Sequence, residues 1–528
     1  MAMSSEGPVN VNQTTPDASR DEQDLVFAYL GDPTTHGGAL VRRIDTHAAV
    51  VFLAGDRAFK VKRAVRFPFL DFSTLEKRKA ACEAELAVNR PFAPDVYHRV
   101  VAITRDSSSR LAIAGSGPPI EWLVEMVRFD ENGTLDHVAS KGRIDLGIAD
   151  TLARTVATAH AKAPVVDASR WIDALASYVE QNDTAFREDR DLFPSAEADH
   201  LTRACRAELA RLRPLLMARG HQGLIRQGHG DLHLGNIAII DGLPVPFDAL
   251  EFDPLVASGD VLYDLAFLLM DLVERKLAAA ASVVLNRYLA QTRRIEDLDA
   301  LSALPLFLAM RAAIRAKVTA IRRVHMPAED RSSIATSALT YFRLATALIS
   351  PTSPMLVAIG GLSGTGKSAL AQALAPDLGP APGAVVLRSD VERKAVHGVD
   401  ETEPLPPDAY SAETTARVYA ALAEKAGRVI AAGHSAIVDA VFAEQRERAA
   451  IAAIASTSRV RFRGLFLIAD LDTRLLRVRT RAGDASDADA AVAQRQESYV
   501  LGDLNWAEVD ASGSREDTLR NAKRAAID

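Results

Sequence analysis

The chain of 528 residues is too long for one hydrophobic core, and typical domain sizes predict about two to four folding units. Its composition, 48% apolar and 25% charged, excludes wholesale disorder, and its formal charge of -7 argues against a general nucleic-acid binder. The two cysteines, Cys82 and Cys205, stand far apart and outside any CxxC, so we expect a reducing compartment, the cytoplasm.

Residues 1–20 are polar and have neither the basic start nor the apolar run of a signal peptide. We therefore expect a disordered tail there, followed by a helix over residues 21–30. The longest apolar runs have about half the length of a bilayer crossing, so we expect no membrane segment.

The next part of the chain alternates β-rich and helical patterns. Two β-rich runs flank a glycine turn within residues 48–65 and predict a hairpin. A helix is predicted over residues 73–90, opened by a capping box of Ser73 and Glu76. A further strand is predicted over residues 121–129.

Helical periodicity dominates residues 144–219, gives way to strand and loop patterns over 224–252, and returns over 259–348. This order predicts a β-rich small lobe at about 21–128 and a helical large lobe at about 129–348.

The first chemical motif is HGDLHLGN, which places Asp231 and Asn236 five residues apart in one short loop. A predicted hairpin follows and ends at Asp248. Phosphoryl transfer needs a carboxylate that deprotonates the acceptor hydroxyl, and an amide and a second carboxylate that hold magnesium. On the residues alone, Asp231 as a turn cap and Asn236 as a backbone partner stay open.

This loop resembles the catalytic loop of the aminoglycoside phosphotransferase and choline kinase-like branch of the protein-kinase superfamily. The resemblance implies an α+β protein-kinase-like domain over 21–348, with Asp231 as catalytic base and Asn236 and Asp248 as Mg2+ ligands. It also implies that His229 shapes the loop.

Four polar residues near this motif are expected to be structural. Asp260 and Asp264 stand about one helical turn apart and are expected to brace the loop rather than touch substrate. His160 and His233 receive no role, because a lone histidine is more often structural than catalytic.

A kinase-like fold holds the ATP phosphates with a strand lysine paired to a helix glutamate. Lys60 is our first choice, and Lys62 stays open because side chains two apart share a strand face. As its partner the resemblance favours Glu85 over Glu83. Solvated, unpaired charges are the alternative.

The resemblance makes the strand at 121–129 the hinge, with Glu125 and Met126 lining the adenine pocket. The sequence departs from the protein-kinase pattern in one respect, since no GxGxxG covers the predicted hairpin. We therefore expect a weaker grip on phosphate in this half of the chain.

Residues 349–354 form a Ser/Pro-rich linker, and residues 355–359 are an apolar strand that runs into GLSGTGKS before a helix. This is a complete P-loop in its required context, so Lys367 is expected to reach the β and γ phosphates and Ser368 to ligate Mg2+. The predicted ATP contacts are Gly361, Leu362, Ser363, Gly364, Thr365, Gly366, Lys367 and Ser368. The alternating strands and helices that follow predict a doubly wound α/β P-loop NTPase domain over 355–528.

Two further carboxylates complete the predicted P-loop site. Asp439 ends an apolar strand, which suits a magnesium contact through water. Asp390 is predicted to orient the acceptor hydroxyl and Arg393 to hold an anionic group, with a capping role for Ser389 or Asp390 as the alternative.

An arginine-rich helix lies near the C-terminus. Its side chains form either a lid over the transferring phosphates or a solvated helical face, and both hypotheses stay open. The arginines concerned are Arg474, Arg477, Arg479 and Arg481.

Residues 355–510 resemble the small-molecule kinase group of P-loop proteins, which includes gluconate kinase, zeta-toxin-like kinases and the kinase half of polynucleotide kinase. The order of the two motifs resembles the bacterial bifunctional aminoglycoside phosphotransferase-like/ATP-binding proteins over nearly all of the chain after residue 20. The resemblance implies two ATP sites with Mg2+.

The leading hypothesis is a kinase that transfers a γ-phosphate to a hydroxyl of a small molecule, because the acidic chain suits a polynucleotide less well. A polynucleotide 5′-hydroxyl end stays open as an acceptor, because Asp390 and Arg393 would suit it. A regulatory ATP-binding protein or ATPase is a rival hypothesis, and so is an active P-loop kinase behind a degenerate kinase-like domain. The sequence carries no signal for oligomeric state.

Overall fold

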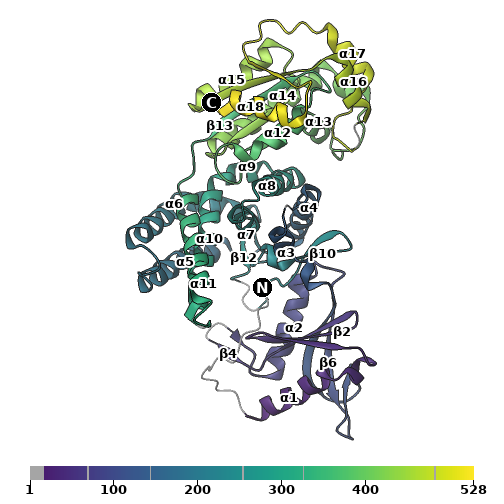
Figure 1. Ribbon diagram of the computed structural model, residues 1–528, viewed down its shortest axis with the longest axis vertical. Helices are drawn as coiled ribbons and strands as arrows, with labels where there is room; N and C mark the ends of the chain where they lie inside the picture. The colour runs from purple at the N-terminus through teal and green to yellow at the C-terminus, as the bar shows by residue number, and fades with distance from the viewer. Residues whose placement is uncertain are drawn as a thin grey trace. The chain divides into compact units, whose positions relative to one another are not determined.

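The computed structural model describes residues 17–67, 70–142, 144–251, 255–324, 326–480 and 483–527 (Figure 1). The chain divides into two compact units. The first contains Met1–Arg275 and Phe307–Thr346, and the second contains Lys276–Leu306 and Ala347–Asp528. We expected Lys276–Leu306 in the kinase-like domain, whereas by compactness it groups with the residues beyond the linker.

The N-terminal part of the first unit is a six-stranded antiparallel sheet in the order β1-β2-β3-β8-β6-β7. Its strands are β1 (Val41–Asp45), β2 (Ala49–Ala54), β3 (Arg57–Lys62), β6 (Tyr97–Arg105), β7 (Leu111–Ile113) and β8 (Pro119–Val127). A short ladder of β4 (Arg66–Phe67) and β5 (Leu70–Asp71) accompanies it. The predicted hairpin is therefore confirmed as β2 and β3.

Successive residues of a strand point their side chains to opposite faces of the sheet, and a helix packs against each face. Leu123 of β8 packs in one cluster with α1 (Asp17–Gly31), while its neighbour Val124 packs in another with Cys82 of α2 (Leu75–Asn89). Helix α1 begins earlier than the 21–30 expected, and residues 1–16 of the predicted tail lie outside the described residues. The predicted capping box at Ser73 is wrong, because Thr74 is the N-cap residue and accepts from Lys77 N.

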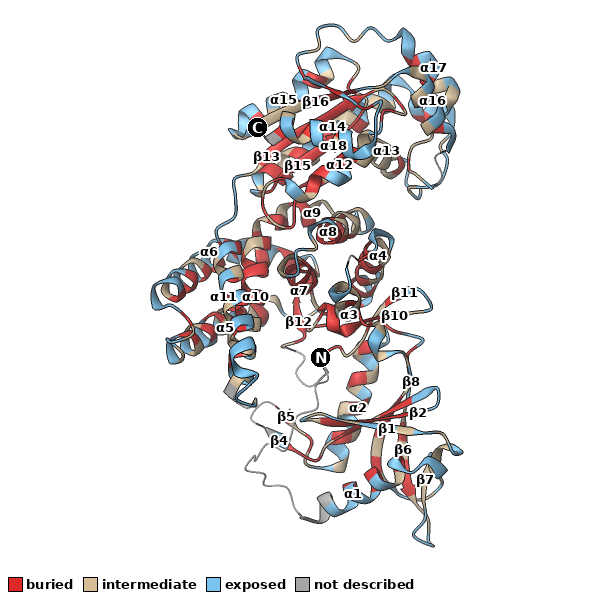
Figure 2. Cartoon of the chain, viewed as in Figure 1, coloured by how far each residue is buried: buried red, intermediate tan, exposed pale blue. Residues whose placement is uncertain are grey.

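The rest of the first unit is mainly helical. Helix α7 (Val261–Glu274) is mostly apolar, and residues 261–272 are buried without a break, as expected of a helix at the centre of a core (Figure 2). The other helices of this part are α3 (Leu135–Ser140), α4 (Leu146–Lys162), α5 (Ala168–Glu188), α6 (Ser195–His221), α10 (Leu304–Val324) and α11 (Arg331–Leu348). Two short antiparallel ladders complete it: β9 (Ile225–Gln227) with β12 (Ser258–Asp260), and β10 (Ile237–Ile240) with β11 (Leu243–Pro246).

The second unit is built on a five-stranded parallel sheet in the order β14-β15-β13-β16-β17. All seven residues of β13 are buried, and Val357 and Ile359 form a core with α12 and α18. The strands are β13 (Met355–Gly361), β14 (Val385–Arg388), β15 (Ala436–Asp439), β16 (Arg461–Ile468) and β17 (Ala507–Asp510). The helices are α8 (Ala278–Thr292), α9 (Ile295–Asp299), α12 (Lys367–Leu374), α13 (Ser389–Val396), α14 (Ala412–Ala431), α15 (Gln445–Ser458), α16 (Leu471–Thr480), α17 (Ala490–Arg495) and α18 (Arg515–Ile527).

The predicted fold classes are confirmed. The first unit has the α+β protein-kinase-like fold, and the second has the doubly wound α/β fold of P-loop proteins. Within the described ranges, every helix falls short of the combined length and apolar character that a membrane crossing requires.

Candidate active sites

Helix α7 holds the HGDLHLGN loop of the first unit through hydrogen bonds with the loop backbone. The backbone N–H groups of His229 and Gly230 donate to the Asp264 carboxylate at 2.9 and 2.8 Å, and His160 Nε2 lies 3.0 Å from it. Burial raises the pKa of Asp264, but the His160 hydrogen bond and the charge interactions with His160, Arg311 and His229 together outweigh this and lower it below the usual range. Arg311 of α10 donates to the Gly230 carbonyl at 3.2 Å. Asp264 thus braces the loop.

Asp260 has a different structural role. Its carboxylate accepts two hydrogen bonds from the Arg219 guanidinium, at 2.5 and 2.8 Å, and both side chains are buried. It also caps α7 by accepting from Leu262 N at 2.9 Å. Asp260 therefore joins α6 to the start of α7 instead of touching the loop.

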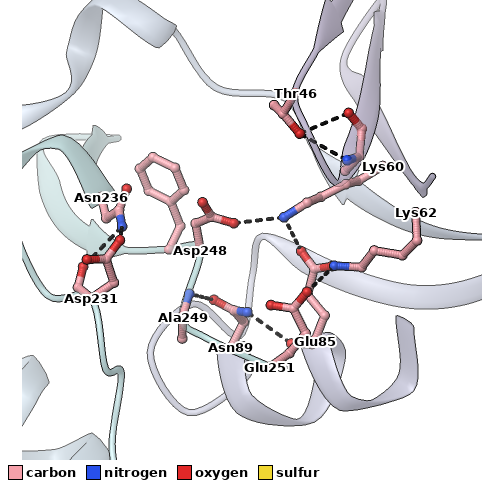
Figure 3. A network of polar contacts seen from close by, with 12 residues as sticks. Thr46, Lys60, Lys62, Glu85, Asn89, Asp231, Asn236, Asp248, Ala249 and Glu251 are labelled. Carbon is pink, nitrogen blue, oxygen red and sulfur yellow. Dashed lines mark hydrogen bonds and ion pairs between the residues drawn. The ribbon is translucent and has the colours of Figure 1, made fainter. Parts of the chain in front are cut away.

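Asp231 and Asn236 meet within the loop, as Figure 3 shows. Asn236 Nδ2 donates at 3.0 Å to both the side-chain Oδ2 and the backbone carbonyl of Asp231. His233 Nε2 lies 3.5 Å from Asp231 Oδ2. Burial raises the pKa of Asp231, but the interactions with His233 and the positive charge of Arg315 contribute to a net lowering below the usual range, so this carboxylate is ionised at neutral pH.

Lysines from β3 and glutamates from two other segments form a buried ionic cluster (Figure 3). Lys60 Nζ lies 2.7 Å from Glu85 Oε1 and 2.7 Å from Asp248 Oδ1. Lys62 Nζ lies 2.6 Å from the other Glu85 oxygen and also contacts Glu251. Both lysines suggested by the sequence therefore pair with Glu85, which rules out a solvated pair of charges here. Burial lowers the pKa of Lys60, but the facing carboxylates raise it well above the ordinary value.

The segment around Asp248 is tied down by groups that the sequence analysis did not identify. Asp248 has a φ of 60°, and its N–H donates to Tyr97 Oη at 3.0 Å. The next N–H, of Ala249, donates to Asn89 Oδ1 at 2.9 Å. Asn89 lies one helical turn after Glu85 on α2, so a single helix holds both the lysine and the Asp248 segment.

Glu125 and Met126, which we expected to line the adenine pocket, both lie on β8. Glu125 is 3% exposed, and its carboxylate contacts the guanidinium groups of Arg57 and Arg99, so its charge serves to pair strands. Met126 packs partly buried against neighbouring strand residues. The turn between β1 and β2 spans residues 46–48 and contains no glycine, in keeping with the missing glycine-rich loop.

In the second unit, the P-loop runs from the end of β13 into α12. Gly366 precedes the helix with a φ of 94°, and Gly364 has a φ of 87°. A side chain at Gly364 would bring its Cβ to 2.6 Å from the Arg474 carbonyl oxygen, so only glycine fits there. Lys367 Nζ donates to the Leu362 carbonyl within the loop at 3.2 Å.

The hydroxyl of Ser368 donates to Asp439 Oδ2 at 2.5 Å. Asp439 ends β15, directly beside Ile359 of β13, so two adjacent parallel strands deliver the P-loop and the carboxylate to one edge. Burial raises the pKa of Asp439, although Lys367, Arg388 and Ser368 act against this rise.

Arg388 is a site residue that the sequence analysis missed. Its Nε lies 3.6 Å from Asp439 Oδ2, and its Nη2 lies 2.6 Å from Asp484 Oδ1. It precedes Asp390, which lies in the first turn of α13. The N-cap residue of α13 is Arg388 and makes no side-chain cap, so Ser389 and Asp390 do not act as caps.

The basic side chains of α13 are bound within the unit. Arg393 donates to the Ala409 carbonyl at 2.8 Å and lies over the Tyr410 ring, 4.9 Å from its centroid. Lys394 pairs with Asp487 at 2.7 Å.

The arginine-rich helix α16 contributes support to the P-loop instead of a set of free cations. Arg474 is buried and donates to the carbonyls of Ser363 at 2.9 Å and Ala493 at 3.0 Å. Arg477 donates to the Thr365 carbonyl at 3.4 Å, whereas Arg479 is exposed. Arg481 lies outside the described residues.

Magnesium fits these residues only as a partner of bound phosphate. The described part of the chain contains no cluster of three or more His, Cys, Asp or Glu side chains placed to hold a metal ion. Mg2+ commonly binds one or two protein oxygens and completes its shell with phosphates and water. Ser368 with Asp439, and Asn236 with Asp248, match that limited donor set.

Comparison with known proteins agrees with this two-part arrangement. A family model described as "AAA domain" matches residues 356–500. The protein called "Uncharacterized protein Rv2004c" of Mycobacterium tuberculosis is 30% identical over 489 residues, covering 90% of this chain and 94% of that protein. The chain belongs to the family of this mycobacterial protein. Because the match covers nine-tenths of the chain, the family shares both units.

Two solved structures match parts of the chain. A gluconokinase from Sinorhizobium meliloti is 20% identical and covers 33% of this chain and 93% of its own, with a TM-score of 0.24. A choline/ethanolamine kinase family protein from Mesorhizobium loti is 15% identical and covers 62% of this chain and 99% of its own, with a TM-score of 0.37.

Proposed function

We propose that the protein is an ATP-dependent phosphotransferase with two nucleotide sites, and that its P-loop unit transfers a γ-phosphate to a hydroxyl of a small molecule. The observation that carries this proposal is the 2.5 Å contact between Ser368 and Asp439 beside the P-loop lysine. It brings a hydroxyl and a carboxylate to the one place where a magnesium ion on P-loop-bound phosphate needs oxygen ligands.

In this proposal each polar group of the P-loop unit has one task. The loop N–H groups and the start of α12 hold the phosphates, and Lys367 leaves the Leu362 carbonyl to contact the β and γ phosphates. Ser368 and Asp439 would hold Mg2+, which would neutralise phosphate charge when bound. Asp390 takes the proton of the acceptor hydroxyl as its oxygen bonds to the γ-phosphorus and the bond to ADP breaks.

The acceptor is proposed to be a small molecule, acting in the cytoplasm. The net charge of -7 disfavours a long polyanion. Arg393, which we expected to hold an anionic group, already donates to the Ala409 carbonyl, so the proposal does not require an anionic acceptor.

The first unit supports a second proposal, a phosphotransfer site of its own. Lys60 with Glu85, and Asp231 with Asn236, are paired at 2.7 and 3.0 Å, so the parts of a kinase-like site are assembled. The rival is a regulatory ATP-binding role, which the glycine-free turn at 46–48 favours. The two differ in whether Asp231 matters for turnover.

The test is transfer of labelled γ-phosphate from ATP to sugar acids, nucleosides, aminoglycosides and 5′-hydroxyl oligonucleotides, with wild type, Lys367→Ala and Asp231→Asn compared. We expect Lys367→Ala to lower transfer to a small molecule by at least about 100-fold. Loss in Asp231→Asn for another acceptor would assign a second active site. Transfer only to oligonucleotides would replace the small-molecule acceptor, and ATP binding without any transfer would favour the regulatory role.

A further inference from the structure

The segment Lys276–Leu306, here called the docking segment, groups with the P-loop unit although more than 40 residues of other structure separate it from β13. Its helix α8 lies against β14. Strand β14 is at the edge of the parallel sheet, with β15 on one side only. An edge strand leaves backbone N–H and C=O groups without a strand partner, and these groups need other partners when buried.

Asn286 of α8 supplies such partners. Its Oδ1 accepts from Val386 N at 2.7 Å, and its Nδ2 donates to the Ala384 carbonyl at 3.1 Å. A primary amide offers one acceptor and two donors, like the groups of a peptide bond. Asn286 therefore pairs with the edge of β14 as a neighbouring strand would.

Two arginines of the docking segment bind the chain just after the C-terminal end of α13. Arg287 pairs with Glu401 at 2.6 Å, and both side chains are less than one-fifth exposed. Arg293 donates to the Val399 carbonyl at 2.9 Å. Helix α13 is thus held by the docking segment both before its start, through Asn286, and after its end.

The residues held in this way lead directly to the catalytic edge of the sheet. Arg388 follows Val386 by two residues, ends β14 and contacts Asp439 and Asp484. Asp390 follows in the first turn of α13. A shift of β14 along its neighbour would move Arg388 away from Asp439.

We infer that Asn286 is a positioning residue of the P-loop unit: by pairing with Ala384 and Val386 it fixes β14, and through it Arg388 and Asp390. The inference rests on the proposed function for its kinetic readout, and on the hydrogen bonds alone for its structural one. A residue that lies before the linker in the sequence therefore helps to position the acceptor side of the P-loop unit.

The test compares full-length wild type with Asn286→Ala and Asn286→Asp. The aspartate keeps an oxygen for Val386 N but cannot donate to the Ala384 carbonyl. Ala279→Ser, at an exposed position of the same helix, is the matched control. Each is measured by hydrogen exchange of the peptide spanning residues 384–390, by ATP affinity, and by kcat and KM for the acceptor.

We expect exchange across residues 384–390 to accelerate about tenfold in Asn286→Ala, the effect of one or two lost hydrogen bonds, and less in Asn286→Asp. Acceptor kcat/KM should fall by a similar factor, while ATP affinity stays within about twofold because β13 and the P-loop are untouched. Ala279→Ser should match wild type.

Unchanged exchange at 384–390 in Asn286→Ala would overturn the inference. A parallel loss of ATP affinity and acceptor turnover would also overturn it, since Asn286 would then support the whole unit. If wild type transfers phosphate to no acceptor, the proposed function fails separately, and the exchange of residues 384–390 still decides whether Asn286 fixes the strand.

Discussion

Lys62 Nζ lies 2.6 Å from Glu85 Oε2, the oxygen that Lys60 does not contact. A single carboxylate on α2 therefore bridges two lysines that stand two residues apart on β3. Glu85 is 1% exposed and Lys62 2% exposed, so this arrangement is shielded from water. The pair of lysines makes Glu85 more important to the fold than a one-to-one ion pair would be.

We expect Glu85→Gln to destabilise the small lobe by about 3 kcal/mol, because removing one partner from a buried ionic cluster leaves charge uncompensated. Native-state hydrogen exchange of β3 measures this. Glu83→Gln is the matched control, since Glu83 is 58% exposed and lies 3.7 Å from Lys79; it should change stability by less than about 0.5 kcal/mol. Equal effects of the two variants would contradict the role given to Glu85.

A second prediction concerns pH. His434 is buried, and its Nε2 donates to the Gly383 carbonyl at 2.8 Å. Burial lowers the pKa of His434 from 6.5 to about 4, the hydrogen bond opposing this only in part. Below pH 6.5 the unfolded chain takes up a proton that the folded chain refuses until about pH 4, so stability is full above pH 6.5 and falls as the pH drops.

Between pH 7 and pH 5, the second unit should lose about 2 kcal/mol through His434, at about 1.4 kcal/mol for each pKa unit. Hydrogen exchange of β13, corrected for intrinsic rates at each pH, measures the loss. His434→Gln keeps an N–H donor but does not titrate, and it should remove most of this dependence. A dependence that survives in His434→Gln would assign the pH effect to another group.

The P-loop glycine Gly364 offers a steric test. In Gly364→Ala the new methyl would lie 2.6 Å from a backbone carbonyl oxygen, which cannot move aside, so we expect the variant to lose ATP binding by the second unit. Gly398→Ala is the control: Gly398 also has a positive φ, 70°, but open space around it, so the change should cost only about 1 kcal/mol and keep ATP binding. Equilibrium binding of a fluorescent ATP analogue measures both.

Arg474 and Arg479 separate support of the P-loop from a phosphate lid. Arg474→Ala leaves the Ser363 and Ala493 carbonyls buried without their donor and should cost about 3 kcal/mol, with weaker ATP binding. Arg479→Ala, on the exposed side of the same helix, should leave thermal stability unchanged. If Arg479→Ala instead lowers phosphate transfer at unchanged stability, the lid hypothesis gains support.

The motifs were visible in the sequence because their chemistry is local. Asp231 and Asn236 are five residues apart in one loop and contact each other. Lys367 and Ser368 directly follow the glycines that the backbone of a P-loop requires. Period two along β3 correctly placed Lys60 and Lys62 on one face, yet it could not choose between them, and the structure pairs both with Glu85.

Residues that act on distant backbone left no signal. Asn89 and Arg474 bind main-chain groups of segments more than 100 residues away, and any asparagine or arginine on a helix reads the same way in the sequence. The grouping of the docking segment with the second unit was not predicted for a related reason. Apolar spacing shows that α8 has a buried face, but it does not show which sheet covers that face. The prediction of the helix cap was wrong on a smaller scale, since Ser73 and Thr74 are both favoured cap residues and the sequence does not show which of them caps the helix.

The second unit is built from two separate segments of the sequence, and this has a consequence for its synthesis on the ribosome. Ala384 is made 98 residues after Asn286, which at about 5–20 residues per second is an interval of roughly 5–20 s. Throughout that interval the ribosome has delivered α8 without the strand it covers, so the nascent chain presents an apolar helix face to chaperones. If the gene were divided at the linker, α8 would never meet β14 within one chain, because neither half would encode both the helix and the strand.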